Sequence, residues 1–251
     1  MNAFTFIKKM EKRGQVTIFI IIAIVIIVAG FLVFMFYPQL RGGFTSETDN
    51  INVFVEECIR DSGINVIYEV GKTGGYFFIP ELSTSTGIPY YYHGGKNYMP
   101  SKEEIETQIS FYISQKLFFC TKNFVDFKDF EIISGDIKIK TRIFDNKVIL
   151  DVEYPLRIKK GESISLLKNF KNIEIPVRLG IVYNSVFEIM EKQVGRQDIC
   201  LSCILELSLE NDLYIEMMDF DEETTIFIFR DENSELNNNF FELRFANKYI
   251  R

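Results

Sequence analysis

Cys200 and Cys203 are the residues whose spacing most directly suggests chemistry, because they form a CxxC motif in the segment DICLSCILEL. If a helix begins near Asp198, the two cysteines lie about one turn apart, close enough for a local disulfide. Such a pair can exchange disulfides, but thioredoxin-like sites place the first cysteine directly after a strand, and a helix-like segment precedes Cys200. We therefore predict a structural disulfide, with thiol–disulfide catalysis as the alternative.

Cys58 and Cys120 lie on the apolar faces of two predicted helices. The first helix follows Ser46 as its N-cap, and its apolar face contains Cys58 together with Ile51, Phe54, Val55 and Ile59. The second begins at Ser101 with a glutamate three residues later, the capping-box spacing, and aligns Cys120 with Ile105, Ile109, Tyr112, Ile113 and Leu117. A Cys58–Cys120 disulfide would close a loop of about 60 residues, worth about 4 kcal/mol in the chain-entropy model. We favour this pairing, and two reduced, buried cysteines are the alternative.

The rest of the sequence offers little for catalysis or metal binding. His93 is the only histidine and lies in a Gly-rich stretch, so a hydrolase of the Ser-His-Asp or Cys-His type would depend on that residue. A zinc site would need four ligands, usually in two close pairs, whereas Cys58 and Cys120 are 62 residues apart. The sequence contains no P-loop, GxSxG, HExxH or dinucleotide-binding pattern. We expect no catalytic residue, no cofactor and no metal ion.

Residues 16–37 form one apolar segment, VTIFIIIAIVIIVAGFLVFMFY, with no charge over 22 positions. As a helix it would be about 33 Å long, which matches the hydrocarbon core of a bilayer. Basic residues cluster before it in KKMEKR and only Arg41 follows closely, so the positive-inside rule places the N-terminus in the cytoplasm. A cleaved secretory signal fits less well, because its apolar core would be shorter and a small-residue cleavage site would follow. We predict a single-pass membrane protein with a signal anchor.

The predicted organisation has four parts: a basic cytoplasmic tail (1–15), a transmembrane helix (16–37), a polar stalk (38–46) and an extracytoplasmic domain (47–251). The tail and helix are basic, whereas the chain beyond residue 43 carries 23 of the 28 basic and 34 of the 35 acidic residues. An acidic domain without a basic stripe repels phosphate backbones, so nucleic-acid binding is not expected. Disulfides persist outside the cell, which favours two bridges among the four cysteines.

The junction KRGQVTIFI resembles the processing site of archaeal prepilin-like, class III signal peptides, with basic residues and a glycine before the cut and an apolar stretch after it. The resemblance implies cleavage between Gly14 and Gln15, which would leave the apolar helix attached to the mature chain. In pilins this helix first sits in the membrane and can then pack into a filament core. Many pilins carry a glutamate five residues into the mature chain, where this sequence has Phe19. A pilin-like filament subunit is therefore an alternative to an anchored surface protein.

The domain also looks similar to uncharacterised membrane-anchored envelope proteins of small-genome archaea in its GGY, IPYY and CLSC segments, a similarity that implies no activity. Residues 71–101 concentrate glycines, prolines and tyrosines in one irregular stretch. Exposed tyrosines beside glycines would give a recognition surface for a protein or a glycan. The candidates are Tyr76, Tyr90, Tyr91, Tyr92 and Tyr98. The structural alternative is that these tyrosines only cover an edge of the core.

Runs of helices and hairpins without strict βα alternation predict an α+β fold for the domain, with antiparallel hairpins packed with three to four helices. Residues 137–154 alternate on both sides of a DNK turn, which is a β-hairpin pattern. A further strand is predicted over 163–175, followed by a helix from Pro176 to about Gln193 with the proline in its first position, and by a shorter helix with the CxxC motif. The segment from Leu213 onward predicts three strands separated by acidic and Asn-rich turns.

These features predict a membrane-anchored cell-surface protein with a structural or interaction role and no evident catalytic activity. Its predicted partners are membrane lipid, through residues 16–37, and a surface protein or glycan, while association with further copies of the chain stays open. The alternatives are a pilin-like filament subunit and an extracytoplasmic thiol–disulfide enzyme that uses Cys200 and Cys203.

Overall fold

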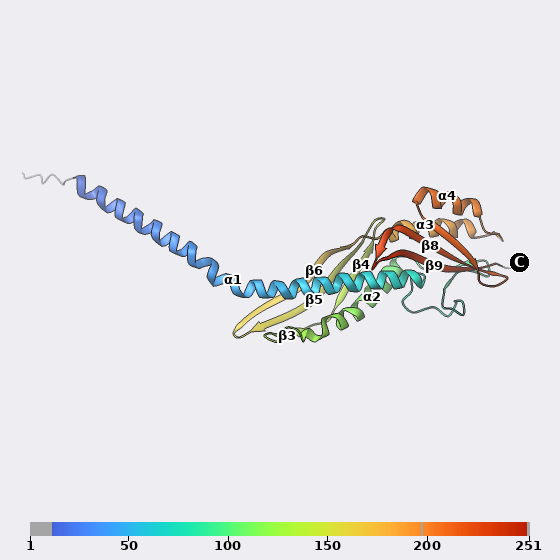
Figure 1. Ribbon diagram of the computed structural model, residues 1–251, viewed down its shortest axis with the longest axis horizontal. Helices are drawn as coiled ribbons and strands as arrows, with labels where there is room; N and C mark the ends of the chain where they lie inside the picture. Colours follow the sequence, from blue (N-terminus) through green and yellow to red (C-terminus); the bar gives the residue numbers. More distant parts are fainter. Residues whose placement is uncertain (1–11, 197, 250–251) are drawn as a thin grey trace, which may run out of the picture. The chain divides into compact units, whose positions relative to one another are not determined.

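The structure is a computed structural model that contains both helices and β-strands, so the predicted α+β class is confirmed (Figure 1). It describes the backbone of residues 12–196 and 198–249. Side chains are described over the same residues, except in helix α1 (Lys12–Lys72), where they are described for 21–31 and from Thr48 onward.

The chain forms two compact units, Met1–Asn50 and Ile51–Arg251, and α1 contributes residues to each. The predicted membrane span, residues 16–37, is helical, which confirms the prediction of a helix there. Within the side chains that the structure describes, no helix is long and apolar enough to cross a bilayer. Within the predicted span, the structure describes the side chains of residues 21–31 only. The side chains of the rest of the span lie outside the described residues.

Helix α1 continues through the region where the sequence predicted a stalk and a second helix. Residues 38–46 are helical, and Ser46 lies inside α1 instead of serving as an N-cap. The prediction rested on the polar segment RGGFTSETD, whose two glycines are poor helix formers. Extending a formed helix adds one hydrogen bond for each residue fixed, whereas starting a second helix requires a new nucleus. The prediction of a helix boundary at Ser46 is therefore wrong.

A four-stranded antiparallel sheet forms around the long strand β5 in the second unit. Its strands are β3 (Glu131–Ser134), β4 (Lys138–Ile143), β5 (Val148–Lys160) and β6 (Ser163–Ile175). Strand β6 pairs along one edge of β5, while β4 and β3 pair in succession along the other edge. The β4–β5 pairing confirms the predicted hairpin, and β6 confirms the predicted further strand.

The last three strands form an antiparallel meander, as the sequence predicted. They are β7 (Tyr214–Asp219), β8 (Thr224–Leu236) and β9 (Asn239–Lys248). Two short strands from the Gly-rich stretch, β1 (Tyr90–His93) and β2 (Lys96–Asn97), extend this sheet to the order β2-β1-β9-β8-β7. Strand β1 lies parallel to β9, a pairing that the sequence did not indicate.

Three further α-helices and one short 3₁₀-helix complete the second unit. They are α2 (Lys102–Thr121), η1 (Lys122–Phe124), α3 (Leu179–Gln193) and α4 (Leu201–Asn211). The capping box predicted for α2 is confirmed, because Glu104 N donates to Ser101 Oγ at 3.2 Å and Ser101 N donates to Glu104 Oε2 at 2.6 Å. Helix α4 begins at Leu201, with Cys200 as its N-cap residue, and therefore later than the predicted start near Asp198.

Helix α3 also begins later than predicted. Pro176 precedes the helix, and Arg178 is the N-cap residue. Arg178 N donates a hydrogen bond to Ser234 Oγ at 2.8 Å, and its guanidinium pairs with the buried Asp231 at 2.9 Å. Because these contacts hold Arg178 against β8, the helix starts after it. The prediction that Pro176 occupies the first helical position is wrong.

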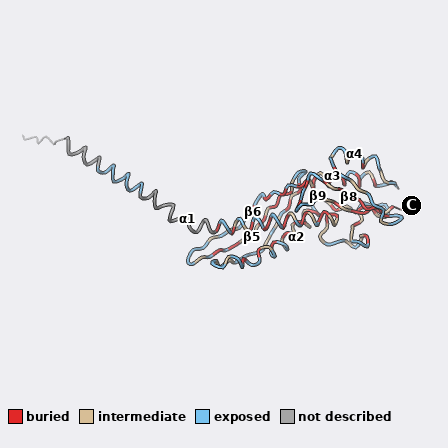
Figure 2. Tube along the Cα trace, in the orientation of Figure 1, coloured by how far each residue is buried: buried red, intermediate tan, exposed pale blue. Residues whose placement is uncertain are grey.

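One hydrophobic core joins the part of α1 beyond Asn50 with α2, α3 and both sheets. Buried positions recur every three or four residues along this part of α1, as expected for an amphipathic helix (Figure 2). The predicted inward residues that are buried are Ile51, Val55, Cys58, Ile59, Ile105, Ile109, Ile113 and Leu117. The remaining predicted inward residues, Phe54, Tyr112 and Cys120, are half-buried and pack against the same core.

Candidate functional site

Residues 21–31 of α1 form an exposed apolar helical surface. Every residue of this stretch is exposed, and the large apolar side chains range from 50% exposed at Ile22 to 70% at Ile27. They face all directions around the helix, because five of them are consecutive, from Ile24 to Val28. A helix that is apolar all round requires an apolar cover on every side.

Covering this surface would release a large free energy. Burying one Ile, Val or Phe side chain contributes about 1.5 to 3 kcal/mol. The large exposed side chains are Ile21, Ile22, Ile24, Val25, Ile26, Ile27, Val28 and Phe31. Their removal from water therefore supplies on the order of 10 kcal/mol to association with whatever apolar material covers them.

The first disulfide, Cys58–Cys120, joins α1 to α2 and confirms the predicted pairing. Its Cα atoms are 5.7 Å apart, and 62 positions separate the two cysteines in the chain. Cys58 is buried in the core and Cys120 is half-buried beside it. A bridge across so long a loop removes much freedom from the unfolded chain, worth about 4 kcal/mol in the chain-entropy model. It therefore acts as a structural staple.

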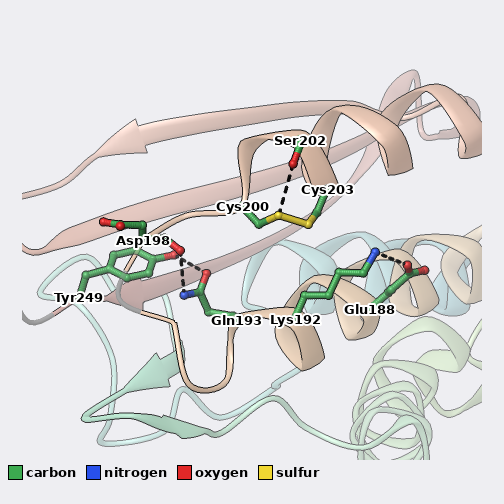
Figure 3. Close-up of a disulfide and its surroundings, with 8 residues drawn as sticks. All are labelled: Glu188, Lys192, Gln193, Asp198, Cys200, Ser202, Cys203 and Tyr249. Carbon is green, nitrogen blue, oxygen red and sulfur yellow. Dashed lines mark hydrogen bonds and ion pairs between the residues drawn. A yellow bond between two sulfur atoms is a disulfide. The ribbon is translucent and has the colours of Figure 1, made fainter.

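The second disulfide, Cys200–Cys203, lies at the start of α4 and confirms the predicted local pairing (Figure 3). Its Cα atoms are 5.3 Å apart with a sequence separation of three. The same entropy model gives only about 2 kcal/mol for so short a loop. Both cysteines are half-buried, and Cys200 Sγ lies 3.6 Å from the hydroxyl of the exposed Ser202. This disulfide therefore sits at the surface and contributes little to global stability.

A buried polar network holds the loop that leads to Cys200. Gln193, the last residue of α3, is buried, and its Nε2 donates to the carbonyl oxygens of Arg196 at 3.3 Å and Asp198 at 3.4 Å. The hydroxyl of Tyr249 donates to Gln193 Oε1 at 3.3 Å (Figure 3). Burial raises the pKa of Tyr249 to about 12, so this hydroxyl keeps its proton at neutral pH. The start of α4 is thereby fixed to the protein interior.

Comparisons with known proteins do not assign this chain to a family. No family model matches the chain, and neither the curated proteins nor the solved structures include a match. The resemblance of the segment around Gly14 and Gln15 to class III signal peptides therefore stays a prediction. Both residues belong to the helical backbone of α1, and their side chains lie outside the described residues.

The five tyrosines predicted to form one recognition surface do not share an exposed face. Tyr91 is buried, stacks on Phe245 at 4.5 Å between ring centroids, and donates to Gly74 O at 3.0 Å. Tyr92 is also buried, and its hydroxyl donates to Arg196 O at 3.3 Å, in the loop before the CxxC motif. Successive strand residues point to opposite faces, so their joint burial means that both faces of β1 are covered. For these two residues the structural alternative is correct.

The other three predicted tyrosines are more accessible. Tyr98 is exposed, while Tyr76 and Tyr90 are half-buried. Tyr90 lies beside His93, with 5.4 Å between ring centroids, and His93 is half-buried at the end of β1. A role for these tyrosines in recognition stays a prediction.

The domain has two exposed apolar features that the sequence alone did not indicate. A cleft of about 390 Å³ lies between the loop after α1 and helix α2, lined mainly by Phe77, Phe78, Phe111, Tyr112 and Phe119. Helix α4 exposes Leu201, Leu205 and Leu209, between 61% and 75% of each side chain, while it buries Ile204 and Leu207. The four-residue spacing of these leucines and the adjacent Phe pairs were visible in the sequence, but only the fold shows which of them are exposed among the described residues.

Within the described part of the chain, no three His, Cys, Asp or Glu side chains are grouped so that they could hold a metal ion. All four cysteines are used in the two disulfides.

Proposed function

We propose that this protein is anchored in a membrane by the apolar segment of α1 and displays its α+β domain outside the cell. The observation that supports the proposal most strongly is the exposed, all-round apolar surface of residues 21–31. Lipid chains would cover such a surface from every side. The flanking residues of the predicted span, which carry no charge, extend the apolar stretch to 22 positions.

The orientation follows from the charges and agrees with the cysteines. Basic residues precede the apolar segment, which favours a cytoplasmic N-terminus. Two disulfides are stable in the oxidising environment outside the cell and would be unusual in a cytosolic domain. We therefore assign the domain a structural or interaction role at the cell surface, with a surface protein or glycan as its partner.

Protease treatment of intact cells tests this placement. We expect added protease to remove peptides of the domain from intact cells that produce the full chain, while a cytoplasmic marker survives. Mass spectrometry of the released peptides provides the measurement. Domain peptides that appear only after lysis would show that the domain lies inside the cell.

Substitutions in α1 test the anchor itself. Ile24→Asp with Ile27→Asp places two charges in the apolar segment, at a cost of about 5 to 7 kcal/mol for insertion. We expect this double variant to be lost from the carbonate-washed membrane fraction. Ile133→Asp with Ile164→Asp is the matched control, because both residues are exposed in the domain. Equal recovery of the two double variants in the membrane fraction would contradict the anchor.

A pilin-like filament subunit is the second candidate, and the continuity of α1 favours it. The one helix Lys12–Lys72 includes both the apolar segment and residues that belong to the core of the domain. Copies of such a helix could cover one another's apolar surfaces in a filament. The intact mass of the extracted protein tests the idea, because the resemblance to class III signal peptides implies a mature chain that begins at Gln15. A full-length mass, unchanged by Gly14→Val, would count against processing.

A further inference from the structure

The Cys200–Cys203 disulfide occupies a position suited to exchange chemistry. Cys200 is the N-cap residue of α4 and forms no side-chain cap hydrogen bond, and Cys203 is the third residue of the helix. At an N-cap, an oxygen of Ser or Asp ordinarily accepts hydrogen bonds from the free N–H groups of the first turn. A Cys200 thiolate, formed when the disulfide opens, would occupy this place and meet the positive end of the helix dipole. The helix start therefore stabilises the reduced form that exchange requires.

The chain fixes this disulfide without enclosing it. Gln193, Tyr249 and Tyr92 hold the preceding loop through hydrogen bonds to the interior. Cys200 itself is only half-buried, and its Sγ lies beside the hydroxyl of the exposed residue Ser202 (Figure 3). A half-buried cysteine on a loop held by hydrogen bonds suits attack by a thiol from another molecule, since exchange depends on access to the sulfur that is attacked.

An apolar surface begins next to the disulfide. Leu201, Leu205 and Leu209 lie one turn apart on the exposed face of α4, and we call them the leucine stripe. Glu206 and Glu210, also exposed, belong to the same helix. The basic Lys192 of α3 is already paired with Glu188 at 2.7 Å. The stripe therefore offers an apolar contact with acidic neighbours, which favours a partner segment with apolar and basic side chains.

We propose that Cys200–Cys203 is an exchangeable disulfide that reacts with the cysteine thiols of proteins docked on the leucine stripe. This activity is independent of the membrane anchor and of any filament. The substrate class is a protein dithiol whose cysteines lie close to apolar and basic residues. The choice of partner rests on Leu201, which belongs to the leucine stripe and directly follows Cys200. A protein segment bound on the stripe would therefore bring its thiols close to the Cys200 sulfur.

The exchange balances without another reactant. A client thiolate attacks Cys200 Sγ, the bond between the two sulfurs breaks, and Cys203 leaves as a thiolate that takes a proton from water. The second client thiolate then attacks the client sulfur of the mixed disulfide, and Cys200 leaves. Two electrons and two protons move in total from the client dithiol to Cys200 and Cys203. A small-molecule disulfide such as oxidised glutathione can restore the pair, and is itself reduced to two thiols.

Equilibration of the full chain in glutathione buffers provides the first test. Alkylation followed by peptide mass analysis reports which disulfide is reduced at each ratio of reduced to oxidised glutathione. We expect Cys200–Cys203 to open at ratios about 100-fold less reducing than those needed for Cys58–Cys120. Reduction of both disulfides together, or of Cys58–Cys120 first, would overturn the proposal.

Trapping provides the second test, with two single variants matched to each other. Cys203→Ser leaves a free thiol at Cys200, whereas Cys200→Ser leaves one at Cys203. The probe is a synthetic peptide with one internal disulfide flanked by leucine and lysine residues. We expect Cys203→Ser to form the mixed disulfide with this peptide at least about tenfold faster than Cys200→Ser. Equal rates, or rates no faster than that of a free cysteine peptide, contradict the proposal.

The stripe is tested in the Cys203→Ser background. Leu205→Gln should slow trapping of the probe peptide about tenfold, because it removes one apolar contact. Its reaction with oxidised glutathione should stay unchanged, since glutathione is too small to use the stripe. Leu166→Gln is the control, because Leu166 is an exposed leucine on β6. Loss of rate with both substitutions, or with neither, would show that the stripe does not dock the client.

Discussion

Two stretches of helix α1 lie in different surroundings. Residues 21–31 are exposed on every side, whereas from Ile51 to Lys72 one face is buried and the other carries charged residues such as Glu56 and Arg60. The secondary structure is the same in both. What differs is the pattern of the apolar residues. They are uninterrupted in the first stretch, whereas in the second they recur about every 3.6 positions. Within the described residues, the domain covers the apolar face of the amphipathic stretch and leaves the uniformly apolar stretch exposed.

The glycines of α1 show the same difference at atomic scale. Gly63 and Gly71 lie where neighbouring elements approach the helix closely, so that an added Cβ would meet atoms of Leu150 or Phe241. Gly30 has no atom within 4 Å of the place that a Cβ would take. Close approach to a neighbour therefore explains the first two glycines and leaves the third unexplained within the described residues.

A charge placed in each stretch gives the largest contrast. Ile59→Asp puts a carboxylate among buried side chains and should cost on the order of 5 kcal/mol of unfolding free energy. Ile26→Asp should leave the unfolding free energy of the domain unchanged, because Ile26 is exposed. Urea unfolding of the full chain in detergent measures both. A similar loss from Ile26→Asp would mean that residues 21–31 are covered by the domain.

The staple between α1 and α2 gives the next largest effect. Replacing both Cys58 and Cys120 with serine should lower the unfolding free energy by about 4 kcal/mol, because the bridge closes a long loop. Replacing Cys200 and Cys203 together should cost at most about 2 kcal/mol. The urea midpoints of the two double variants, measured without reductant, make the comparison. If the second pair proves the costlier, the assignment of the staple to Cys58–Cys120 fails.

The sequence revealed most of the elements that depend on local patterns. The capping box at Ser101, the hairpin of β4 and β5 and the C-terminal meander all follow from short-range spacing. The Cys58–Cys120 pairing was predictable for the same reason, because each cysteine lies on the apolar face of a helix. Periodicity identifies such faces, and helices must bury them.

The features that escaped prediction depend on contacts between distant parts of the chain. The parallel pairing of β1 with β9 places Tyr91 and Tyr92 in the core, whereas the sequence left both an exposed surface and a buried edge open for them. The late start of α3 depends on the contacts of Arg178 with β8. For the candidate site, the cysteines were identified from their spacing, but the N-cap position of Cys200 and the exposure of the leucine stripe required the fold.

Alanine substitutions at the α1 glycines give the smallest and most local contrast. At Gly71 the added Cβ would run into the carbonyl oxygen of Glu242 and lie 2.7 Å from Phe241 Cε2, so Gly71→Ala should cost about 1 to 3 kcal/mol. Gly63→Ala should cost less, because the atoms it meets are the side-chain ends of Leu150 and Ile175. Gly30→Ala meets open space and should not lower the melting temperature of the domain.

Thermal unfolding of the three variants, followed by circular dichroism, gives their order directly. An alanine also favours the helix over a glycine by up to about 1 kcal/mol, so a gain in helicity from Gly30→Ala is compatible with the expectation. A drop in melting temperature for Gly30→Ala as large as that for Gly71→Ala would mean that a protein surface packs against residue 30. The first stretch of α1 would then be covered by protein, and lipid would no longer be needed to explain its composition.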